Sequence, residues 1–78
     1  MPTVLRSGPY RFFFYAGDRA EPAHVHVERD DRECKFWLEP ITLERNPGFS
    51  RKAISTIRRL IEWNHALLME RWNEYFQE

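Results

Sequence analysis

Two histidines and a glutamate, His24, His26 and Glu28, occupy alternate positions in the first half of the chain, with a valine in each gap. Side chains at alternate positions of a β-strand point to the same face of a sheet. A strand here would therefore place the three titratable groups on one face and turn the two valines to the other. One face would pack against the protein core, and the opposite face would carry groups capable of chemistry.

Three interpretations of this pattern follow from the chemistry of imidazole. Neutral histidines two positions apart on a strand can both bind zinc, nickel or another divalent metal ion, and Glu28, Asp18 or His65 would supply a third ligand. Alternatively, His24 or His26 acts as a general acid or base in phosphodiester cleavage, because imidazole titrates near neutral pH. In the third interpretation both histidines are solvent-facing or hydrogen-bonded structural residues. The short His-x-His pattern leaves all three open.

The segment that follows Ser50 is basic at its start. It carries four basic residues before Leu60 and no acidic one: Arg51, Lys52, Arg58 and Arg59. If this segment is a helix, cations in its first turn oppose the macrodipole and cost about 0.3–1 kcal/mol each. Free backbone N–H groups and basic side chains at a helix start can instead hold a phosphate together. Arg51, Lys52 and Arg58 therefore form a candidate anion site for RNA, DNA or an acidic protein, with a solvated basic face as the alternative.

Large aromatic residues gather near the C-terminus, at Trp72, Tyr75 and Phe76. They either cover the sheet as core residues or form a contact surface, because tryptophan and tyrosine are enriched at the energetic centres of protein interfaces. In the second case the surface would bind a partner protein or a second copy of this chain.

Turn-forming residues divide the first part of the chain into short strands. The aromatic run at residues 10–15 predicts a strand with both faces covered, in the interior of a sheet. Residues 32–38 alternate between apolar and polar side chains, which indicates a strand with one wet face. Residues 41–43 follow Pro40 and are expected at a sheet edge, because proline cannot donate a hydrogen bond to a neighbouring strand.

A helical period of apolar residues runs from Ala53 to Phe76, after Ser50, a good N-cap residue. As one straight helix, residues 51–77 would span about 40 Å at about 1.5 Å per residue, longer than the roughly 30 Å width of so small a domain. We therefore expect a bend or break at Asn64. The whole pattern predicts an α+β fold: an antiparallel sheet of four or five short strands, packed by a long C-terminal helix that is bent or split.

The chain has 78 residues, which predicts a single domain over residues 1–78, with the sheet in 1–45 and the helix in 50–77. Twelve basic and twelve acidic residues cancel, which argues against nucleic-acid binding through bulk charge. Cys34 is the single cysteine, so no internal disulfide can form, as is typical of a reducing cytoplasm. No apolar run approaches the roughly 20 residues of a membrane span. We expect a soluble, cytoplasmic protein that does not enter a membrane.

Several motifs together are similar to those of a known family. They are Pro2-Thr3-Val4, Tyr10-Arg11-Phe12-Phe13-Phe14, the loop at Asp18, Pro22-x-His24-x-His26-Val27, Lys35-Phe36-Trp37-Leu38-Glu39-Pro40, Gly48-Phe49 and Asn64-x-x-Leu67-Leu68-x-x-x-Trp72-Asn73. The chain resembles small bacterial and archaeal proteins catalogued as a domain of unknown function, number four-one-six-zero. Many members of that family are encoded beside a second small uncharacterised domain, in a two-gene arrangement that resembles a toxin–antitoxin module. The resemblance therefore implies a partner protein from a neighbouring gene.

Three functional hypotheses combine these observations. The first is one component of a toxin–antitoxin-like pair, which binds its partner through the aromatic helix end and touches RNA through the histidine face and Arg51, Lys52 and Arg58. The second, from a different class, is a small hydrolase, either an RNase or a metal-dependent phosphoesterase. Its catalytic residues would be His24 and His26, with zinc or another divalent metal as a cofactor. The third is a homodimer joined through the helix ends, without catalysis.

Overall fold

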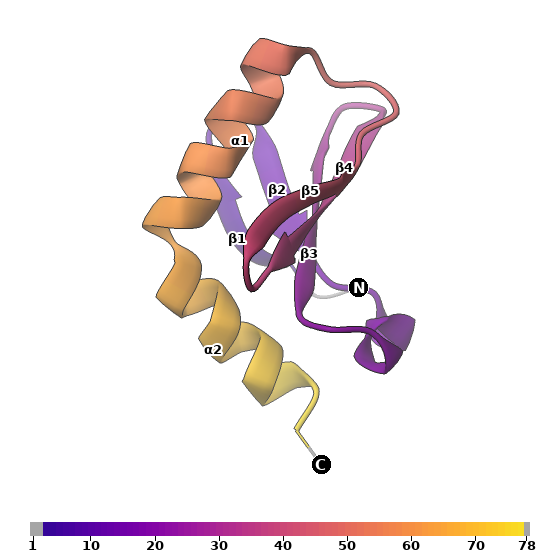
Figure 1. Cartoon of the computed structure of the whole chain (residues 1–78), viewed down its shortest axis with the longest axis vertical. Helices are drawn as coiled ribbons and strands as arrows, with labels where there is room; N and C mark the ends of the chain where they lie inside the picture. Colours follow the sequence, from indigo (N-terminus) through magenta and orange to yellow (C-terminus); the bar gives the residue numbers. More distant parts are fainter. Residues whose placement is uncertain (1–2, 78) are drawn as a thin grey trace.

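The sheet is a meander in which each strand pairs with the next. The computed structural model describes residues 3–77. Met1, Pro2 and Glu78 lie outside the described residues; all three belong to the expected domain, and Pro2 also belongs to the first matched motif. Five antiparallel strands lie in the order β1-β2-β3-β4-β5, and two helices follow (Figure 1). The elements are β1 (Thr3–Ser7), β2 (Tyr10–Phe13), the 3-10 helix η1 (Ala16–Ala20), β3 (His24–Arg29), β4 (Arg32–Leu38), β5 (Ile41–Arg45), α1 (Arg51–Trp63) and α2 (His65–Tyr75). This is the α+β architecture that the sequence predicted, with five strands.

Strand β2 lies in the interior of the sheet, between β1 and β3, as its aromatic composition predicted. It ends at Phe13, short of the expected end at Tyr15. Phe12 and Phe14 are fully buried in the core cluster beneath the helices. Phe13 turns to the other face, where its ring stacks on that of His26. Aromatic side chains therefore fill both faces of the sheet at this point.

Strands β3 and β4 form a tight hairpin. Its turn uses Asp30, whose φ of 57° lies in the left-handed region that aspartate tolerates better than most residues. Within the hairpin, His24 pairs with Trp37 and His26 pairs with Lys35. Trp37 and Lys35 are therefore the cross-strand neighbours of the two histidines on the same face of the sheet.

Strand β5 lies at one edge of the sheet, as the proline before it predicted, and β1 lies at the other edge. The turn between β4 and β5 contains a cis Glu39–Pro40 peptide bond. The hydroxyl of Thr42 donates a hydrogen bond of 3.1 Å to the carbonyl oxygen of Pro40, which closes this turn on the first residues of β5.

The core lies between the sheet and the two helices. Val25 and Val27 of β3 are fully buried in it, so the helices pack on the sheet face that the sequence predicted. The helices contribute five buried side chains to the same cluster: Ile54, Ile57, Ile61, Leu68 and Trp72. Each large apolar side chain that leaves water in this way contributes about 1.5–3 kcal/mol, so the sheet–helix interface is the main source of stability.

The first helix begins at a side-chain cap. The Ser50 hydroxyl oxygen accepts a hydrogen bond of 3.1 Å from the backbone N–H of Ala53, which satisfies one of the free N–H groups at the start of α1. No acidic side chain lies in the first turn of α1. The serine cap that the sequence predicted is therefore present, and the basic residues there have no carboxylate in the same turn.

The helical segment breaks at Asn64, as its length predicted. The Asn64 backbone N–H donates to the carbonyls of Leu60 and Ile61, and its side-chain amide donates to Leu60 at 2.8 Å. Helix α2 then continues in a new direction past the end of the sheet (Figure 1). His65 ties its start to β4, because Nε2 lies 2.6 Å from the Leu38 carbonyl oxygen. None of the described helices is long and apolar enough to cross a membrane.

Candidate metal site on the histidine strand

Three side chains that can bind a metal ion meet beside β3: those of Asp18, His24 and His26. One ligand atom from each lies within 4.8 Å of the other two. His24 is fully buried, His26 is 5% exposed, and the Asp18 side chain is 12% exposed. The cluster is therefore largely buried, and its side chains come from η1 and from the histidine strand β3.

The expectation of a wet sheet face is wrong at the histidines. The ring of His26 stacks on Phe13, with the centroids 5.5 Å apart, and meets Tyr15 edge-on at 4.6 Å. The ring of His24 meets those of Trp37 and Trp72 at 5.5 and 5.1 Å. Aromatic rings from three different elements, together with η1, thus take the place of solvent around both imidazoles.

A short helical turn delivers the carboxylate of Asp18 to the cluster. Its Oδ2 accepts a hydrogen bond of 2.9 Å from the backbone N–H of Tyr15, while the Asp18 N–H donates to the Tyr15 carbonyl at 3.1 Å. The Glu21 N–H then donates to the Asp18 carbonyl at 3.0 Å. These local bonds close the turn and point the carboxylate at the two histidines. The sequence offered Glu28, Asp18 or His65 as a third ligand beside the two histidines. In the structure it is Asp18 that joins them.

The tautomer of His24 follows from its hydrogen bond to the backbone. Its Nδ1 lies 2.8 Å from the carbonyl oxygen of Pro22, which can only accept, so Nδ1 carries the proton. In the neutral ring Nε2 then holds a lone pair, and it lies 3.1 Å from Oδ2 of Asp18. The two atoms lack hydrogen-bond geometry, and Nε2 is buried without a hydrogen-bond partner among residues 3–77. Two electron-rich atoms therefore face each other in a site shielded from water.

His26 contacts a carboxylate on each side of its ring. Nε2 donates a hydrogen bond of 3.0 Å to Oδ2 of Asp18, whereas Nδ1 lies 3.4 Å from Oε2 of Glu33 without hydrogen-bond geometry. The hydroxyl of Tyr15 donates to Glu33 at 3.1 Å. Burial lowers the pKa of His26, and this effect outweighs the opposing influence of Asp18. The neutral imidazole is therefore favoured, and a metal ion at Nε2 would displace the proton that this nitrogen donates to Asp18.

The spacing of the three atoms suits co-ligation of one ion. Oδ2 of Asp18 lies 3.1 and 3.0 Å from Nε2 of His24 and of His26. Ligands bound at about 2.0–2.1 Å stand about 3.3 Å apart around a tetrahedral ion and about 3.0 Å apart around an octahedral one. The outer nitrogen of His24 also has the partner that a metal-bound histidine has, a hydrogen-bonded backbone carbonyl, whereas Nδ1 of His26 only lies near the Glu33 carboxylate.

Glu28 and His65, the other two alternatives for a third ligand, are engaged elsewhere. Glu28 does lie on the histidine face, but its carboxylate forms an ion pair with Arg11, whose Nε donates to it at 2.7 Å. His65 is bound to the Leu38 carbonyl oxygen at the start of α2. Neither belongs to the cluster of three ligands. The sequence predicted Glu28 as a possible metal ligand, but in the structure its side chain is not part of the metal site.

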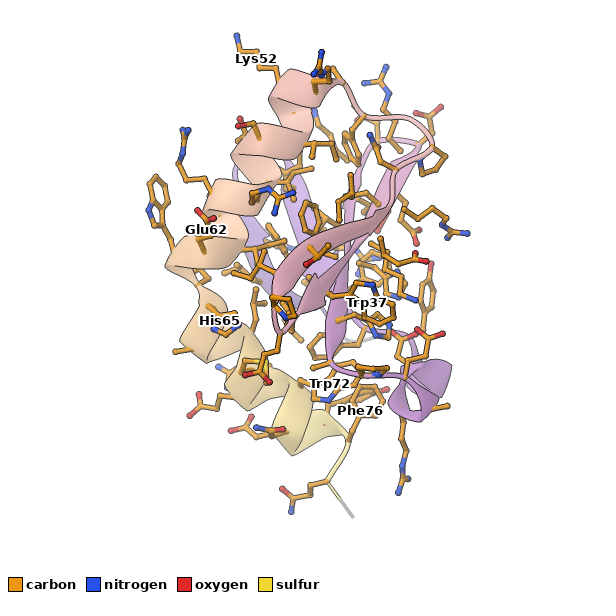
Figure 2. All side chains as sticks on the ribbon, in the orientation of Figure 1. Trp37, Lys52, Glu62, His65, Trp72 and Phe76 are labelled. Atoms are coloured by element: carbon orange, nitrogen blue, oxygen red, sulfur yellow. The ribbon has the colours of Figure 1, made fainter. Side chains whose placement is uncertain are left out.

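The three basic residues of the expected anion site separate in the structure. Arg51 and Arg58 line one open pocket between β5 and α1. The side chain of Lys52 extends outward from the start of α1 (Figure 2). The structure thus unites two of the three cations and leaves the third apart.

The three aromatic residues of the expected partner surface differ in exposure. Trp72 is 9% exposed and packs edge-on against Phe14, with Phe76 beside it (Figure 2). Tyr75 is 42% exposed and so is available for contact. Trp63 is 73% exposed and was not singled out from the sequence. Its position next to the predicted break at Asn64 was the sequence signal that could have indicated its exposure.

The comparisons with known proteins give one match. No curated protein and no solved structure matches the chain significantly. A family model does match, over residues 10–73, a span that contains Asp18, His24 and His26. This span covers most of the chain, including β2 to β5, α1 and most of α2. The chain therefore belongs to the family described as Domain of unknown function (DUF4160).

Proposed function

We propose that the protein binds one divalent transition-metal ion, zinc in the first place, through Oδ2 of Asp18 and Nε2 of His24 and His26. One observation carries the proposal: the lone pair on Nε2 of fully buried His24 lies 3.1 Å from a carboxylate oxygen, with no hydrogen bond between them. A cation between the two atoms converts this contact from repulsion into co-ligation. The same cation gives the buried nitrogen the partner that it lacks.

A doubly protonated His24 is the rival explanation, and the geometry argues against it. An imidazolium would donate from Nδ1 to Pro22 and from Nε2 to Asp18. The first bond is present at 2.8 Å, whereas the second contact lacks hydrogen-bond geometry. A metal ion accounts for both facts at His24, because two ligands of one ion point at the ion and not at each other. At His26 the ion would replace the proton of the hydrogen bond between Nε2 and Asp18.

The donor set favours zinc. Two imidazole nitrogens and one carboxylate oxygen suit Zn²⁺, and also Ni²⁺, Co²⁺ or Fe²⁺, better than Mg²⁺ or Ca²⁺, which prefer oxygen ligands. Burial of all three ligands shields the site from solvent and favours a structural role. An ion there would attach η1 to β3 and so hold the segment between β2 and β3 over the sheet.

A hydrolase that uses His24 and His26 is the alternative function. One observation favours it: three protein ligands leave the fourth position of a tetrahedral ion for water, as in catalytic zinc sites. Substrate would reach that water only after η1 moved away, because the histidines are 0% and 5% exposed. We therefore place the hydrolase second.

The role in a two-gene, toxin–antitoxin-like module is a separate proposal about the surface. Trp63 at 73% and Tyr75 at 42% exposure support it, because exposed tryptophan and tyrosine are typical anchors of protein interfaces. The partner would be the small protein encoded by the neighbouring gene. The buried, unpaired thiol of Cys34 fits a cytoplasmic location for the pair.

Elemental analysis of protein purified without a histidine tag tests the metal proposal. We expect one zinc per chain after equilibration with Zn²⁺, and loss of that zinc in Asp18→Asn and His24→Ala. Glu28→Gln and His65→Ala are the matched controls and should retain it, because neither side chain belongs to the cluster. Less than one-tenth equivalent of every transition metal in the wild-type protein would refute the site.

Two further assays separate the other functions. If the site is structural, RNA and a phosphodiester substrate should remain intact when they are incubated with the zinc-loaded protein. Cleavage that is lost in His26→Ala would instead support the hydrolase function. Co-purification with the product of the neighbouring gene tests the module. We expect Tyr75→Ala to weaken that complex while the zinc content stays at one equivalent.

A further inference from the structure

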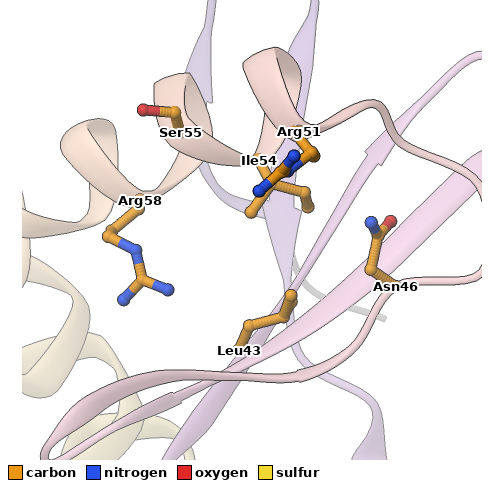
Figure 3. Close-up of a pocket in the computed structure, with 6 residues that line it drawn as sticks. All are labelled: Leu43, Asn46, Arg51, Ile54, Ser55 and Arg58. Atoms are coloured by element: carbon orange, nitrogen blue, oxygen red, sulfur yellow. The ribbon is translucent and has the colours of Figure 1, made fainter.

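An open pocket of about 290 Å³ lies between β5 and α1 and shares no residue with the metal cluster (Figure 3). Its lining residues are Leu43, Asn46, Arg51, Ile54, Ser55 and Arg58. This volume is at the small end of the about 300–1,000 Å³ that is usual for small-molecule sites. On α1 the polar members of the lining are spaced at positions i, i+4 and i+7, so they lie along one side of the helix.

Arg58 makes two contacts at one wall of this pocket. Its Nη1 donates a hydrogen bond of 3.2 Å to the Ile41 carbonyl oxygen, and its guanidinium lies 5.3 Å from the centre of the Phe36 ring. The side chain is only partly exposed. A guanidinium has five N–H donors, and a single one is engaged here by the described residues. The remaining donors form a preorganised cation beside the pocket.

Arg51 supplies a second cation to the same pocket, and no carboxylate lines it. Figure 3 shows the Arg51 and Arg58 side chains on the pocket side of α1, facing Leu43 of β5. Glu44, next to Leu43 on the strand, points to the opposite face because side chains alternate along a strand. Two like charges therefore share one hollow with no counter-charge, an arrangement that a bound anion would relieve.

The rest of the lining indicates what carries the anion. Leu43 and Ile54 are apolar, and Ser55 adds a hydroxyl. Guanidinium groups match the oxygen atoms of phosphate, and the apolar wall suits the non-polar face of a group such as a sugar. We propose that this pocket binds the phosphate of one nucleotide, with Arg51 and Arg58 on the phosphate oxygens. The nucleotide comes either as a free mononucleotide or as one unit of an RNA strand.

The proposal depends on the pocket and not on the positive charge at the start of α1 alone. Lys52 provides the control that distinguishes these two explanations. Lys52 follows Arg51 in the same helical turn, carries the same charge and extends away from the pocket (Figure 2). Lys52→Gln therefore changes the net charge and the charge at the helix start as Arg51→Gln does. Only Arg51→Gln removes a cation from the pocket.

Titration of the zinc-loaded protein with adenosine 5′-monophosphate, inorganic phosphate and a single-stranded RNA hexamer tests the site, with amide NMR shifts and calorimetry as readouts. We expect the mononucleotide to shift the amides of residues 51–58, and Arg51→Gln to weaken binding about tenfold or more, as loss of a charge-assisted hydrogen bond implies. Lys52→Gln should change affinity less than about twofold for a mononucleotide, because a charge outside the pocket is screened by solvent and salt. Asp18→Asn must bind equally well, which excludes phosphate binding to the metal.

The ligand series distinguishes the two sources. RNA that binds at the same amides at least as tightly as the mononucleotide assigns the pocket to RNA, whereas a preference for the mononucleotide assigns it to a free nucleotide. Equal weakening by Arg51→Gln and Lys52→Gln would overturn the proposal, since it would reduce the effect to bulk charge. Absence of any shift at residues 51–58 with millimolar ligand would overturn it as well.

Discussion

Nε2 of His24 faces Oδ2 of Asp18 across 3.1 Å, and no hydrogen bond joins them although the imidazole is fully buried. The proton of that ring is engaged on the other nitrogen, by the Pro22 carbonyl. The contact links β3 to η1, which are also joined by the hydrogen bond between His26 and the same Asp18 oxygen. An ion held between them would bind the folded chain and not the unfolded chain, and so would add directly to the stability of the fold.

Zinc should therefore raise the thermal midpoint of the wild-type protein. A ligand at a free concentration of 100 times its dissociation constant stabilises the folded state by about 2.7 kcal/mol. For a domain of this size, that corresponds to a rise of about 10–20 °C. Asp18→Asn should abolish the rise, and Glu28→Gln should preserve it. Scanning calorimetry with buffered zinc and with a chelator measures both; an equal rise in Asp18→Asn would contradict the assigned ligand.

Trp72 and Tyr75 should differ sharply in their effects on stability. Trp72 packs against Phe14 and His24 and is 9% exposed, so Trp72→Ala should lower the free energy of unfolding by about 3–5 kcal/mol. Tyr75 is 42% exposed, and Tyr75→Ala should cost less than about 1 kcal/mol. Urea unfolding measures the two values. If Trp72→Ala does not fold, Trp72→Phe provides the comparison, and a loss no larger than that of Tyr75→Ala would place Trp72 outside the core.

The thiol of Cys34 should be unreactive in the folded protein. Burial raises the pKa of Cys34 from its ordinary value of 9.0 to about 12, so the nucleophilic thiolate is scarce at pH 8. Because the folded pKa is the higher one, this group contributes stability at pH values below 9, and the contribution is lost as pH rises toward 12. Alkylation by iodoacetamide at pH 8 should follow the small population of unfolded chain, because refolding is faster than alkylation. Rapid alkylation without unfolding would show that the thiol is accessible.

Ser50 should be worth more to stability than Ser55. The Ser50 hydroxyl oxygen caps α1 through Ala53, so Ser50→Ala should cost about 1 kcal/mol. Ser55 is exposed on the same helix and makes no cap, so Ser55→Ala should change stability by less than about 0.5 kcal/mol. Urea unfolding of the two variants side by side gives the comparison, and equal losses would show that the cap contributes nothing.

The chain's local patterns were enough to predict several features of the fold. Alternation placed His24 and His26 on the face opposite Val25 and Val27, and register then set Trp37 beside His24. The serine cap and the break at Asn64 were also predictable. Each of these depends on residues within a few positions of one another, or on the strict period of a strand, so propensity and sterics specify them without the rest of the molecule.

The chemistry of the site depended on contacts that no local pattern encodes. Asp18 became the third member of the cluster because η1 folds back over β3, while Glu28, which satisfied the alternation equally well, was taken by Arg11 from the neighbouring strand. Burial of both histidines came from rings on β2, β4 and α2. The sequence by itself thus determined which face the histidines share. The tertiary structure decided which carboxylate joins them and that water is excluded, because both results depend on segments brought together only by folding.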